Sequence, residues 1–297
     1  MLRIAVPNKG SLCEPAVTML KEAGYKVTRR GRELTIIDKG NDVEFFFLRP
    51  RDIAVYVGSG VVSCGITGRD LLIDSGVAAV EYLGLDFARS TFRFAGPAGQ
   101  FHDLADIQGK RVATSYDLLL KKFLDEHQIS GVRVVHLDGA VESSVQLGIA
   151  DLIADVVETG STLRAAGLQT FGEPLMESEA LLITAAGQEN HAQLQTLAAR
   201  LRGVMVARTY VLMDYNAPSA QLADLLAITP GIESPTISDL AEDTWKAVRV
   251  MVKAADVNLI MDRLYAAGAR GILVTDLKAC RLSRPLRRQL RGARVVV

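Results

Sequence analysis

Short runs of β-branched and aromatic residues alternate with amphipathic segments of helical length in the first part of the chain. The strand-like runs are LRIAVP, VEFFFL and CGIT. Helix-like segments lie from Leu12 to Ala23, after Pro50, and again after CGIT. The alternation of periods predicts a sheet with helices on its faces.

The same pattern repeats after residue 90. The strand-like runs are TFRFAGP, KRVATS, VRVVHL and ADLIADVV, with a helix predicted around Leu118 to Glu126. The next runs, LQTFGEPL and EALLITAA, predict two more strands before a helix from Gln193 to Arg202. We expect the chain to return to the first lobe there, which leaves two crossings and a cleft between the lobes. The expected lobes are 1–90 with 180–203, and 91–179.

Two lobes joined by two crossings describe an α/β fold like that of periplasmic binding proteins. From Met205 the pattern changes. It predicts strands at VARTYVLMDYN, Ser234 to Ile237, Trp245 to Val252 and ARGILVTDL, with helices at Ser219 to Leu226 and Val257 to Ala267. The order βαββαβ is that of a ferredoxin-like, ACT-like module. We therefore expect a separate small domain at 204–282, followed by a tail at 283–297.

Composition supports several packed domains without a membrane segment. The 297 residues are 49% hydrophobic and 23% charged, which is typical of a globular protein. The longest uncharged stretch, Ile53 to Gly68, is broken by glycines and is shorter than a bilayer requires. The N-terminal MLRIAVPNKG reads as a strand entering a loop rather than a secretion signal. We expect a cytoplasmic protein with no membrane partner.

The formal charge is zero, with 34 basic and 34 acidic residues, so a nucleic-acid partner has no global electrostatic support. Five arginines and no acid lie between Ser283 and Val297. Like charges resist compaction, and we predict a mobile, dispensable tail there, with a docked basic helix as the alternative.

Three cysteines without C-x-x-C spacing and four scattered histidines indicate neither a disulfide framework nor a metal held by the protein alone. The most informative segment for chemistry is ADVVETGSTLRAAG. A strand ends at Val157, Thr159-Gly160-Ser161-Thr162 form a tight turn, and Leu163 opens a helix.

Such a turn directs several backbone N–H groups to one point, and its hydroxyls add donors without bulk, so it suits a phosphate. A plain helix-capping sequence is the alternative. Asp151 and Asp155 lie four residues apart on the preceding strand, with Glu158 at its end. Carboxylates beside a phosphate suit ribose hydroxyls and a magnesium ion that a diphosphate carries. The combination predicts a site for a phosphorylated sugar.

The segment from Glu142 to Leu163, ESSVQLGIADLIADVVETGSTL, resembles the signature of ATP phosphoribosyltransferases. The segments PNKGSL, FFLRPRDIAVYV, GITGRDLL, LDGAVESSVQLG and PGIESPTI resemble the long, self-regulated form of that family. One departure is Ser63, where many members of the family carry an acid.

The resemblance implies a reaction. Ring nitrogen 1 of the adenine of ATP attacks the anomeric carbon of phosphoribosyl pyrophosphate, releasing pyrophosphate and giving phosphoribosyl-ATP. It also implies that Thr159, Gly160, Ser161 and Thr162 hold the 5′-phosphate. Asp155, Asp138 and Glu142 would face ribose hydroxyls or magnesium, with Mg²⁺ arriving on the substrate pyrophosphate and protein ligands left open.

On the first lobe, Lys9, Arg49, Arg69 and Asp70 lie in loops after strands, and Gly68 precedes the last two. The cations can neutralise pyrophosphate or the ATP triphosphate, and Lys9, Arg49 and Asp155 are the candidates for catalysis. Solvated surface charge is the alternative, as is a pair between Arg69 and Asp70. The run Phe45-Phe46-Phe47 could stack on adenine, but a buried strand has the same sequence, and we prefer the strand.

The resemblance further implies feedback inhibition by histidine, with Asp214, Ser234 and Thr236 in the pocket, and a homo-oligomer, a hexamer in exchange with dimers. Two rival functions remain. A bilobal solute receptor would carry a secretion signal and has no need of the acidic strand before T-G-S-T. A nucleobase-salvage phosphoribosyltransferase would share the phosphate turn but not the attached domain, nor PNKG and GITGRDLL.

Overall fold

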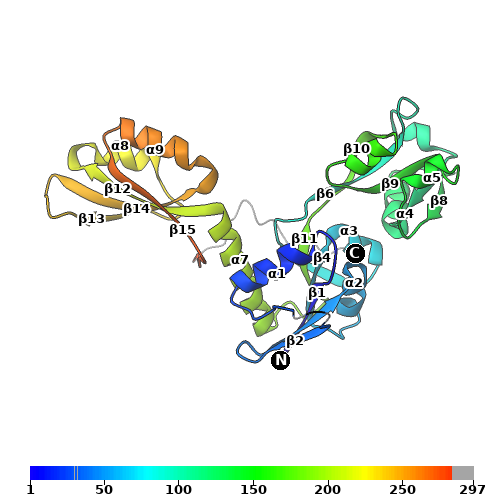
Figure 1. Cartoon of the computed structure of the whole chain (residues 1–297), viewed down its shortest axis with the longest axis horizontal. Coiled ribbons are helices and arrows are strands. Elements are labelled where there is room, and N and C mark those ends of the chain that lie inside the picture. The colour runs from blue at the N-terminus through cyan, green and yellow to red at the C-terminus, as the bar shows by residue number, and fades with distance from the viewer. Residues whose placement is uncertain (30, 32, 283–297) are drawn as a thin grey trace. The chain divides into compact units, whose positions relative to one another are not determined.

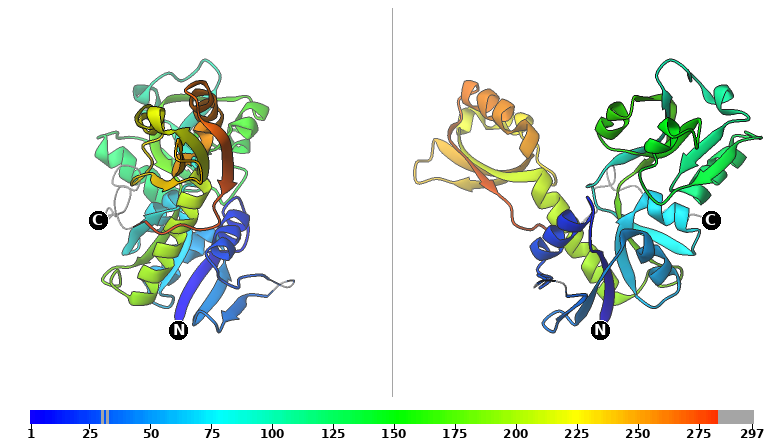
Figure 2. Two further views of the ribbon diagram at one scale, coloured as in Figure 1. Left: turned by 90° about the vertical axis from the view of Figure 1, so that its left-hand side faces the viewer. Right: turned by 45° about the vertical axis from the view of Figure 1, so that its right-hand side comes forward.

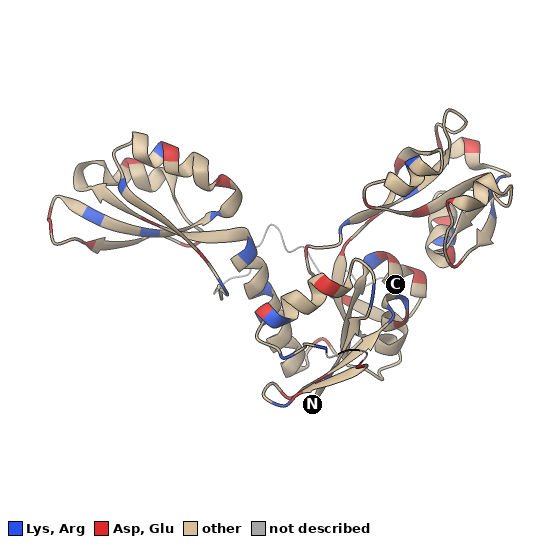
Figure 3. Cartoon of the chain, in the orientation of Figure 1, with Lys and Arg blue, Asp and Glu red and all other residues tan. Residues whose placement is uncertain are grey.

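A computed structural model describes residues 1–29, 31 and 33–282 of the chain (Figures 1 and 2). The predicted basic tail at 283–297 lies outside the described residues. Two compact units are present, one formed mainly by residues 1–198 and the other mainly by residues from 199 onward. Basic and acidic residues are interspersed along both units (Figure 3).

The first sheet has the strand order β2-β3-β1-β4-β11-β5. β1 pairs in parallel with β3 and β4, whereas β11 is antiparallel to both β4 and β5. The prediction that the chain returns to the first lobe is therefore confirmed. The strand bounds are β1 (Leu2–Pro7), β2 (Thr35–Asp38), β3 (Val43–Leu48), β4 (Cys64–Gly68), β5 (Ala79–Gly84) and β11 (Ala180–Ala185).

The second sheet has the order β10-β6-β9-β7-β8. β7 is parallel to β8 and β9, and β6 is antiparallel to β9 and β10. Apart from the edge strand β2, this repeats the topology of the first sheet, with β6 in the position of β11. The strand bounds are β6 (Ser90–Pro97), β7 (Arg111–Thr114), β8 (Arg133–His136), β9 (Leu152–Val157) and β10 (Leu168–Ser178).

Helices connect the parallel strands, as the alternating pattern predicts. They are α1 (Cys13–Glu22), α2 (Pro50–Gly58), α3 (Arg69–Ser75), α4 (Asp117–Glu126), α5 (Ser143–Gln146) and α6 (Ser161–Ala165). The sequence analysis missed β2, β5 and α5. The strand β2 and the helix α5 are each only four residues long, so neither has enough periodicity to be recognised.

The aromatic run belongs to the core of the first lobe. Phe45 and Phe47 are fully buried, and the ring of Tyr25 meets Phe45 edge to face at 6.0 Å. Phe46 points to the other face of the sheet and packs on the apolar cluster that includes Ile53 and Val57 of α2. Both faces of β3 are therefore covered, which is the structural interpretation preferred from the sequence.

The C-terminal unit contains a ferredoxin-like sheet with the order β13-β14-β12-β15, all pairs antiparallel. The helices and the sheet share a core that includes Met213, Tyr215, Leu225, Val250 and Leu264. The element order βαββαβ is as predicted. The elements are β12 (Tyr210–Pro218), α8 (Leu222–Ile228), β13 (Thr236–Asp239), β14 (Trp245–Lys253), α9 (Val257–Ala266) and β15 (Arg270–Asp276).

One boundary differs from the prediction. The residues at 206–209, which were assigned to the first strand of this unit, continue helix α7 (Ala192–Thr209). Val204 and Val206 are buried, so tertiary packing holds these β-branched positions in a helix against their weak strand preference. Among the described residues, no helix combines the length and the apolar composition needed to cross a bilayer.

The contact between α2 and β4 can be tested at Gly65. A Cβ at this position would lie 2.6 Å from Cγ2 of Ile53 and 3.1 Å from Cβ of Ala5. Gly65→Ala should therefore destabilise the protein by about 1–3 kcal/mol through overpacking. Gly139→Ala is the matched control, because nothing lies within 4 Å of its added Cβ. Equal free energies of unfolding for the two variants in urea denaturation would contradict this account.

Candidate active site

The predicted site residues lie at the carboxyl ends of parallel strands in both lobes. Lys9 follows β1, Arg49 follows β3, and Gly68 ends β4 ahead of Arg69 and Asp70. In the second lobe, the candidates follow β8 and β9: Asp138, Glu142, and the turn Thr159 to Thr162, with Asp155 near the end of β9 itself. Because parallel strands end at one edge of a sheet, each lobe gathers its candidates at a single edge.

The T-G-S-T turn has the geometry of an anion-binding loop. Gly160 has φ of 68°, a left-handed conformation that glycine adopts without strain. The hydroxyls of Thr159 and Ser161 lie 3.1 Å apart, and Nη1 of Arg164 donates to the backbone carbonyl of Thr159 at 3.1 Å. Leu163 is buried and anchors the turn to the sheet. The backbone N–H groups of the following helical turn have no partners within their helix.

Asp155 is the most perturbed carboxylate of this edge. Burial raises its pKa to about 6, and the negative charges of Glu142 and Asp70 act in the same direction. Arg51 opposes the shift, as does a hydrogen bond of 2.7 Å that the carboxylate accepts from the backbone N–H of Val156. Glu142 and Asp70 belong to different lobes, so charges from both lobes act on Asp155. Such perturbation is typical of functional sites.

Asp70 is held in place by the hydroxyl of Ser178, which bonds both its side chain and its backbone. Its Oδ1 accepts a hydrogen bond of 2.7 Å from the hydroxyl of Ser178, and its backbone N–H donates to the same hydroxyl at 3.1 Å. A Cβ on Gly68 would lie 2.2 Å from Oδ1 of Asp70, so the glycine leaves room for the carboxylate. Asp70 is buried, and its charge, with that of Asp155, adds to the burial that raises the pKa of Tyr116.

Arg69 does not pair with Asp70, which was one of the alternatives. Its guanidinium contacts Glu81 at 3.1 Å and Glu179 at 3.1 Å. An anion bound by Arg69 would have to compete with these two carboxylates. Lys9 and Arg49 are exposed at the ends of their strands. Beside Lys9, the Oδ1 atom of Asn8 is buried and has no hydrogen-bond partner among the described residues.

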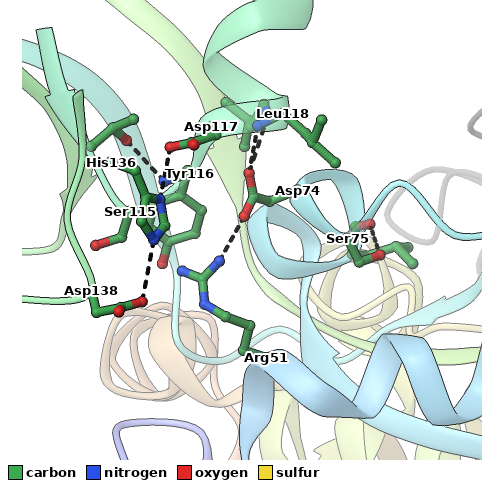
Figure 4. A network of polar contacts seen from close by, with 12 residues as sticks. Arg51, Asp74, Ser75, Ser115, Tyr116, Asp117, Leu118, His136 and Asp138 are labelled. Carbon is green, nitrogen blue, oxygen red and sulfur yellow. Dashed lines mark hydrogen bonds and ion pairs between the residues drawn. The ribbon is translucent and has the colours of Figure 1, made fainter. Parts of the chain in front are cut away.

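The two acidic candidates Asp151 and Asp138 are paired with basic side chains. Asp151 precedes β9 at the opposite edge of the sheet from Asp155, and it accepts a hydrogen bond of 2.8 Å from Nη2 of Arg111. The shared strand therefore does not bring Asp151 to the turn. Asp138 is fully exposed and lies 3.3 Å from Nε2 of His136, whose Nδ1 is 3.0 Å from Asp117 (Figure 4). Hydrogen bonds to Asp117 and then Asp138 raise the pKa of His136.

Sequence reasoning missed two residues of this site, Arg51 and Tyr116. The guanidinium carbon of Arg51 lies 4.8 Å from the ring centroid of Tyr116 (Figure 4). Arg51 is in the first turn of α2 and Tyr116 follows β7, so both come after parallel strands. The strand–helix alternation that selected Arg49 could have selected these two by the same rule.

Ser63, the departure from the family pattern, lies far from these strand ends. It precedes β4, its hydroxyl accepts from the backbone N–H of Arg3 at 3.4 Å, and its carbonyl accepts from the hydroxyl of Thr184 at 3.0 Å. It lines a hollow of about 330 Å³ at the amino ends of β1 and β4, together with Leu2 and His191 among others. An acid at this position would not touch the carboxyl ends.

In the C-terminal unit, the residues predicted to bind free histidine are only partly brought together. Thr236 pairs with Arg249, and Arg249 pairs with Asp214, so the three form one row across β13, β14 and β12. Nε of Arg249 donates to Asp214 at 2.7 Å. Ser234 lies outside this row, in the loop before β13. The sequence analysis did not single out Arg249.

A two-lobed α/β fold with a glycine-centred turn and acidic side chains at the ends of its parallel strands is an arrangement typical of enzymes that act on phosphorylated substrates. The family model HisG, ATP phosphoribosyltransferase, matches residues 49–203, and the model HisG, C-terminal domain, matches residues 207–279. The chain belongs to the ATP phosphoribosyltransferase family, and so it is a pentosyltransferase of histidine biosynthesis.

Individual relatives agree with this assignment. The chain is 59% identical to the ATP phosphoribosyltransferase of Kocuria rhizophila, and the match covers 95% of this chain and 100% of that protein. It is 58% identical to that of Arthrobacter sp. strain FB24, with the same coverage. A solved structure titled ATP phosphoribosyl transferase (HisG:HisZ) complex from Thermotoga maritima has a TM-score of 0.59 at 26% identity, covering 68% of this chain and 96% of that chain.

The raised pKa of Asp155 gives a test of the carboxylate cluster. A folded-state pKa of about 6 against an ordinary value of 3.8 means that the carboxyl favours folding when protonated. This contribution is complete below an ordinary aspartate pKa and is lost as the pH rises through about 6. At about pH 8, Asp155→Asn should therefore raise the free energy of unfolding by up to about 3 kcal/mol while lowering activity.

The measurement is urea denaturation of both proteins from about pH 5 to about pH 8. The stability difference between variant and wild type should shrink toward low pH. Asp125→Asn, at an exposed position on α4, should show no such dependence. A difference that is constant with pH would mean that Asp155 is not the buried, ionised group described above.

Proposed function

We propose that the chain transfers the phosphoribosyl group of phosphoribosyl pyrophosphate to ring nitrogen 1 of the adenine of ATP. The bond between the anomeric carbon and the pyrophosphate oxygen breaks, and the carbon–nitrogen bond forms. The products are phosphoribosyl-ATP and pyrophosphate, and the reaction is the first step of histidine biosynthesis. Family membership supports the reaction. The single observation that supports the location of its site is the left-handed turn at Gly160, close after Asp155 in the chain.

The turn supports binding of the 5′-phosphate. Its hydroxyls, on Thr159, Ser161 and Thr162, are exposed, and its helix start directs N–H groups outward. The preceding strand end supports binding of the sugar, because Asp155 and Glu142 offer acceptors for ribose hydroxyls. Phosphate and ribose groups of one molecule are separated by only a few bonds, which matches a turn and a carboxylate in neighbouring positions of the chain.

The reaction needs charge stabilisation more than a nucleophile. A glycosyl transfer passes through a sugar cation, and the carboxylates of Asp155, Glu142 and Asp70 supply negative potential for it. The leaving pyrophosphate needs cations, and Lys9, Arg49 and Arg51 lie at the strand ends of the first lobe. Sugar-cation stabilisation and anion neutralisation are thus assigned to different groups.

Magnesium fits this site as a companion of the diphosphate. Carboxylate oxygens are hard ligands that suit Mg²⁺, and a nearby cation would favour the ionised form of Asp155 against its raised pKa. In the described part of the chain, no group of three or more His, Cys, Asp or Glu side chains could hold a metal ion. We therefore assign most of the coordination to pyrophosphate and water, with Asp155 and Glu142 as the candidate protein ligands. Bound there, Mg²⁺ would neutralise the leaving group.

We further propose that histidine binds the C-terminal unit and inhibits the reaction. Thr236 and Asp214 flank Arg249 on the same face of the sheet. A free amino acid presents a carboxylate and an ammonium group, which suit a cation beside an anion. Inhibition requires that histidine bind one state of the enzyme better than another, a coupling of about 1–3 kcal/mol in typical cases.

We also propose that the protein is cytoplasmic and assembles into a homo-oligomer. A cytoplasmic homo-oligomer, a hexamer exchanging with dimers, would place several regulatory units in one particle. Sedimentation of the purified chain with and without histidine measures this directly. A monomer under both conditions would overturn the proposed assembly without touching the reaction.

The phosphate assignment is tested by Thr162→Val, which removes a hydroxyl without adding bulk. With purified protein, ATP, phosphoribosyl pyrophosphate and magnesium, the wild type should produce phosphoribosyl-ATP, followed by its absorbance. The variant should lose about 10- to 100-fold in kcat/KM for phosphoribosyl pyrophosphate, the equivalent of 1–3 kcal/mol for a hydrogen bond to a charged group.

Thr196→Val, on the exposed side of α7, is the control and should match the wild type. Gly160→Val should also block the site, but the left-handed φ of Gly160 adds backbone strain to the steric effect, so it is the less specific variant. Unchanged kinetics in Thr162→Val would remove the turn hydroxyl from the phosphate site.

Asp214→Ala should weaken inhibition by histidine with little change in turnover when histidine is absent. Losing one charged partner of a bound amino acid should raise the half-inhibiting concentration by about tenfold or more. The measurement is a histidine titration of the initial rate. Asp262→Ala, on α9 and exposed, is the matched control. Full sensitivity to histidine in Asp214→Ala would place the regulatory site elsewhere.

A further inference from the structure

Asp74 of α3 connects the two lobes through one carboxylate (Figure 4). Its Oδ2 accepts a hydrogen bond of 2.6 Å from Nη1 of Arg51, in the same lobe. Its Oδ1 accepts from the backbone N–H groups of Leu118 and Leu119, at 3.0 and 3.2 Å, in the other lobe. The side chain of Asp74 is only 9% exposed, so these three donors surround a largely dehydrated charge.

Helix α4 depends on this carboxylate for its first turn. The residue at its N-cap position is Tyr116, whose side chain makes no capping hydrogen bond. The first N–H groups of a helix have no partner within it and need acceptors from elsewhere. Asp74 supplies the acceptor from the first lobe, and its negative charge also suits the positive end of the helix. The start of α4 is thereby fixed relative to α3.

Arg51 is fixed by the same contact. Its guanidinium lies between the Asp74 carboxylate and the Tyr116 ring, 4.8 Å from the ring centroid. In this position its charge acts on the buried cluster, because Arg51 opposes the raised pKa of Asp155. The side chain of Arg51 is nevertheless about half exposed. A long, half-exposed side chain has many rotamers, and the ion pair with Asp74 selects the one that lies over the Tyr116 ring.

We propose that Asp74 is a positioning residue for the transfer reaction. It does not contact the reacting atoms in this account. It holds the Arg51 cation toward the carboxylates at the end of β9, and it ties that cation to the helix that follows Tyr116. The inference rests on the proposed function, since it takes these strand ends as the substrate site. Loss of the Asp74 charge should therefore weaken substrate binding more than it weakens the fold.

The test is Asp74→Asn, which keeps the size of the side chain and an oxygen for the N–H groups of α4 but removes the charge that holds Arg51. The KM for ATP or for phosphoribosyl pyrophosphate should rise by about tenfold, as expected for a charge-assisted contact, while kcat changes far less. Asp125→Asn, a carboxylate at the other end of α4, should behave like the wild type. Thermal unfolding of each protein reports the folded fraction.

A double-mutant cycle separates positioning from a structural role. If Asp74 acts through Arg51, then Asp74→Asn combined with Arg51→Met should raise KM no further than Arg51→Met alone. Multiplied effects on KM would overturn the proposal, as would a fall in kcat that only follows the folded fraction with KM unchanged. The wild-type assay distinguishes the two levels: an inactive wild type refutes the proposed function, and an active wild type with a normal Asp74→Asn refutes this inference.

Discussion

The first sheet is complete only because β11 inserts between β4 and β5, after the chain has built the second lobe. Its residues Leu181, Leu182 and Ile183 are fully buried, and the strand has antiparallel partners on both sides. In the second sheet, β6 takes the same position. Each lobe is therefore closed by a strand that crosses from the other, and the carboxyl ends of the parallel strands become the edges that carry polar chemistry. The candidate site follows from this constraint.

The polar residues at those edges are held by groups that come from distant parts of the chain. Ser178, at the second crossing, binds Asp70 after β4, and Asp74 of the first lobe binds the start of α4. Burial and neighbouring negative charge raise the pKa of Asp155 to about 6. At neutral pH the folded protein therefore holds this carboxylate in its ionised form at a cost in stability. Such a cost is expected where a developing positive charge or a cation will later be bound, because the ligand then removes it.

The C-terminal unit carries its candidate histidine site on one face of a single sheet. One face of its sheet is covered by α8 and α9, and the opposite face carries the row of Thr236, Arg249 and Asp214. The Asp214 charge is already paired with Arg249 at 2.7 Å. Histidine would therefore have to bind beside this ion pair or exchange partners with it. Under the proposed regulation, either route would involve Arg249, which its sequence context does not indicate.

The sequence by itself determined the classes of element, the two lobes with their double crossing, and the βαββαβ module, because these depend on local hydrophobic period and on turn residues. It also determined the position of the left-handed turn that is the candidate phosphate site, since Gly160 and its neighbouring hydroxyls are contiguous in the chain. Only the tertiary structure decided which charges meet. Asp151 and Asp155 share a strand yet lie at opposite edges, and Arg69 binds Glu81 and Glu179 rather than Asp70. Arg51, Asp74 and Tyr116 are far apart in sequence and adjacent in space. Pairing of charges depends on the relative positions of elements, and a local sequence pattern carries no information about those positions.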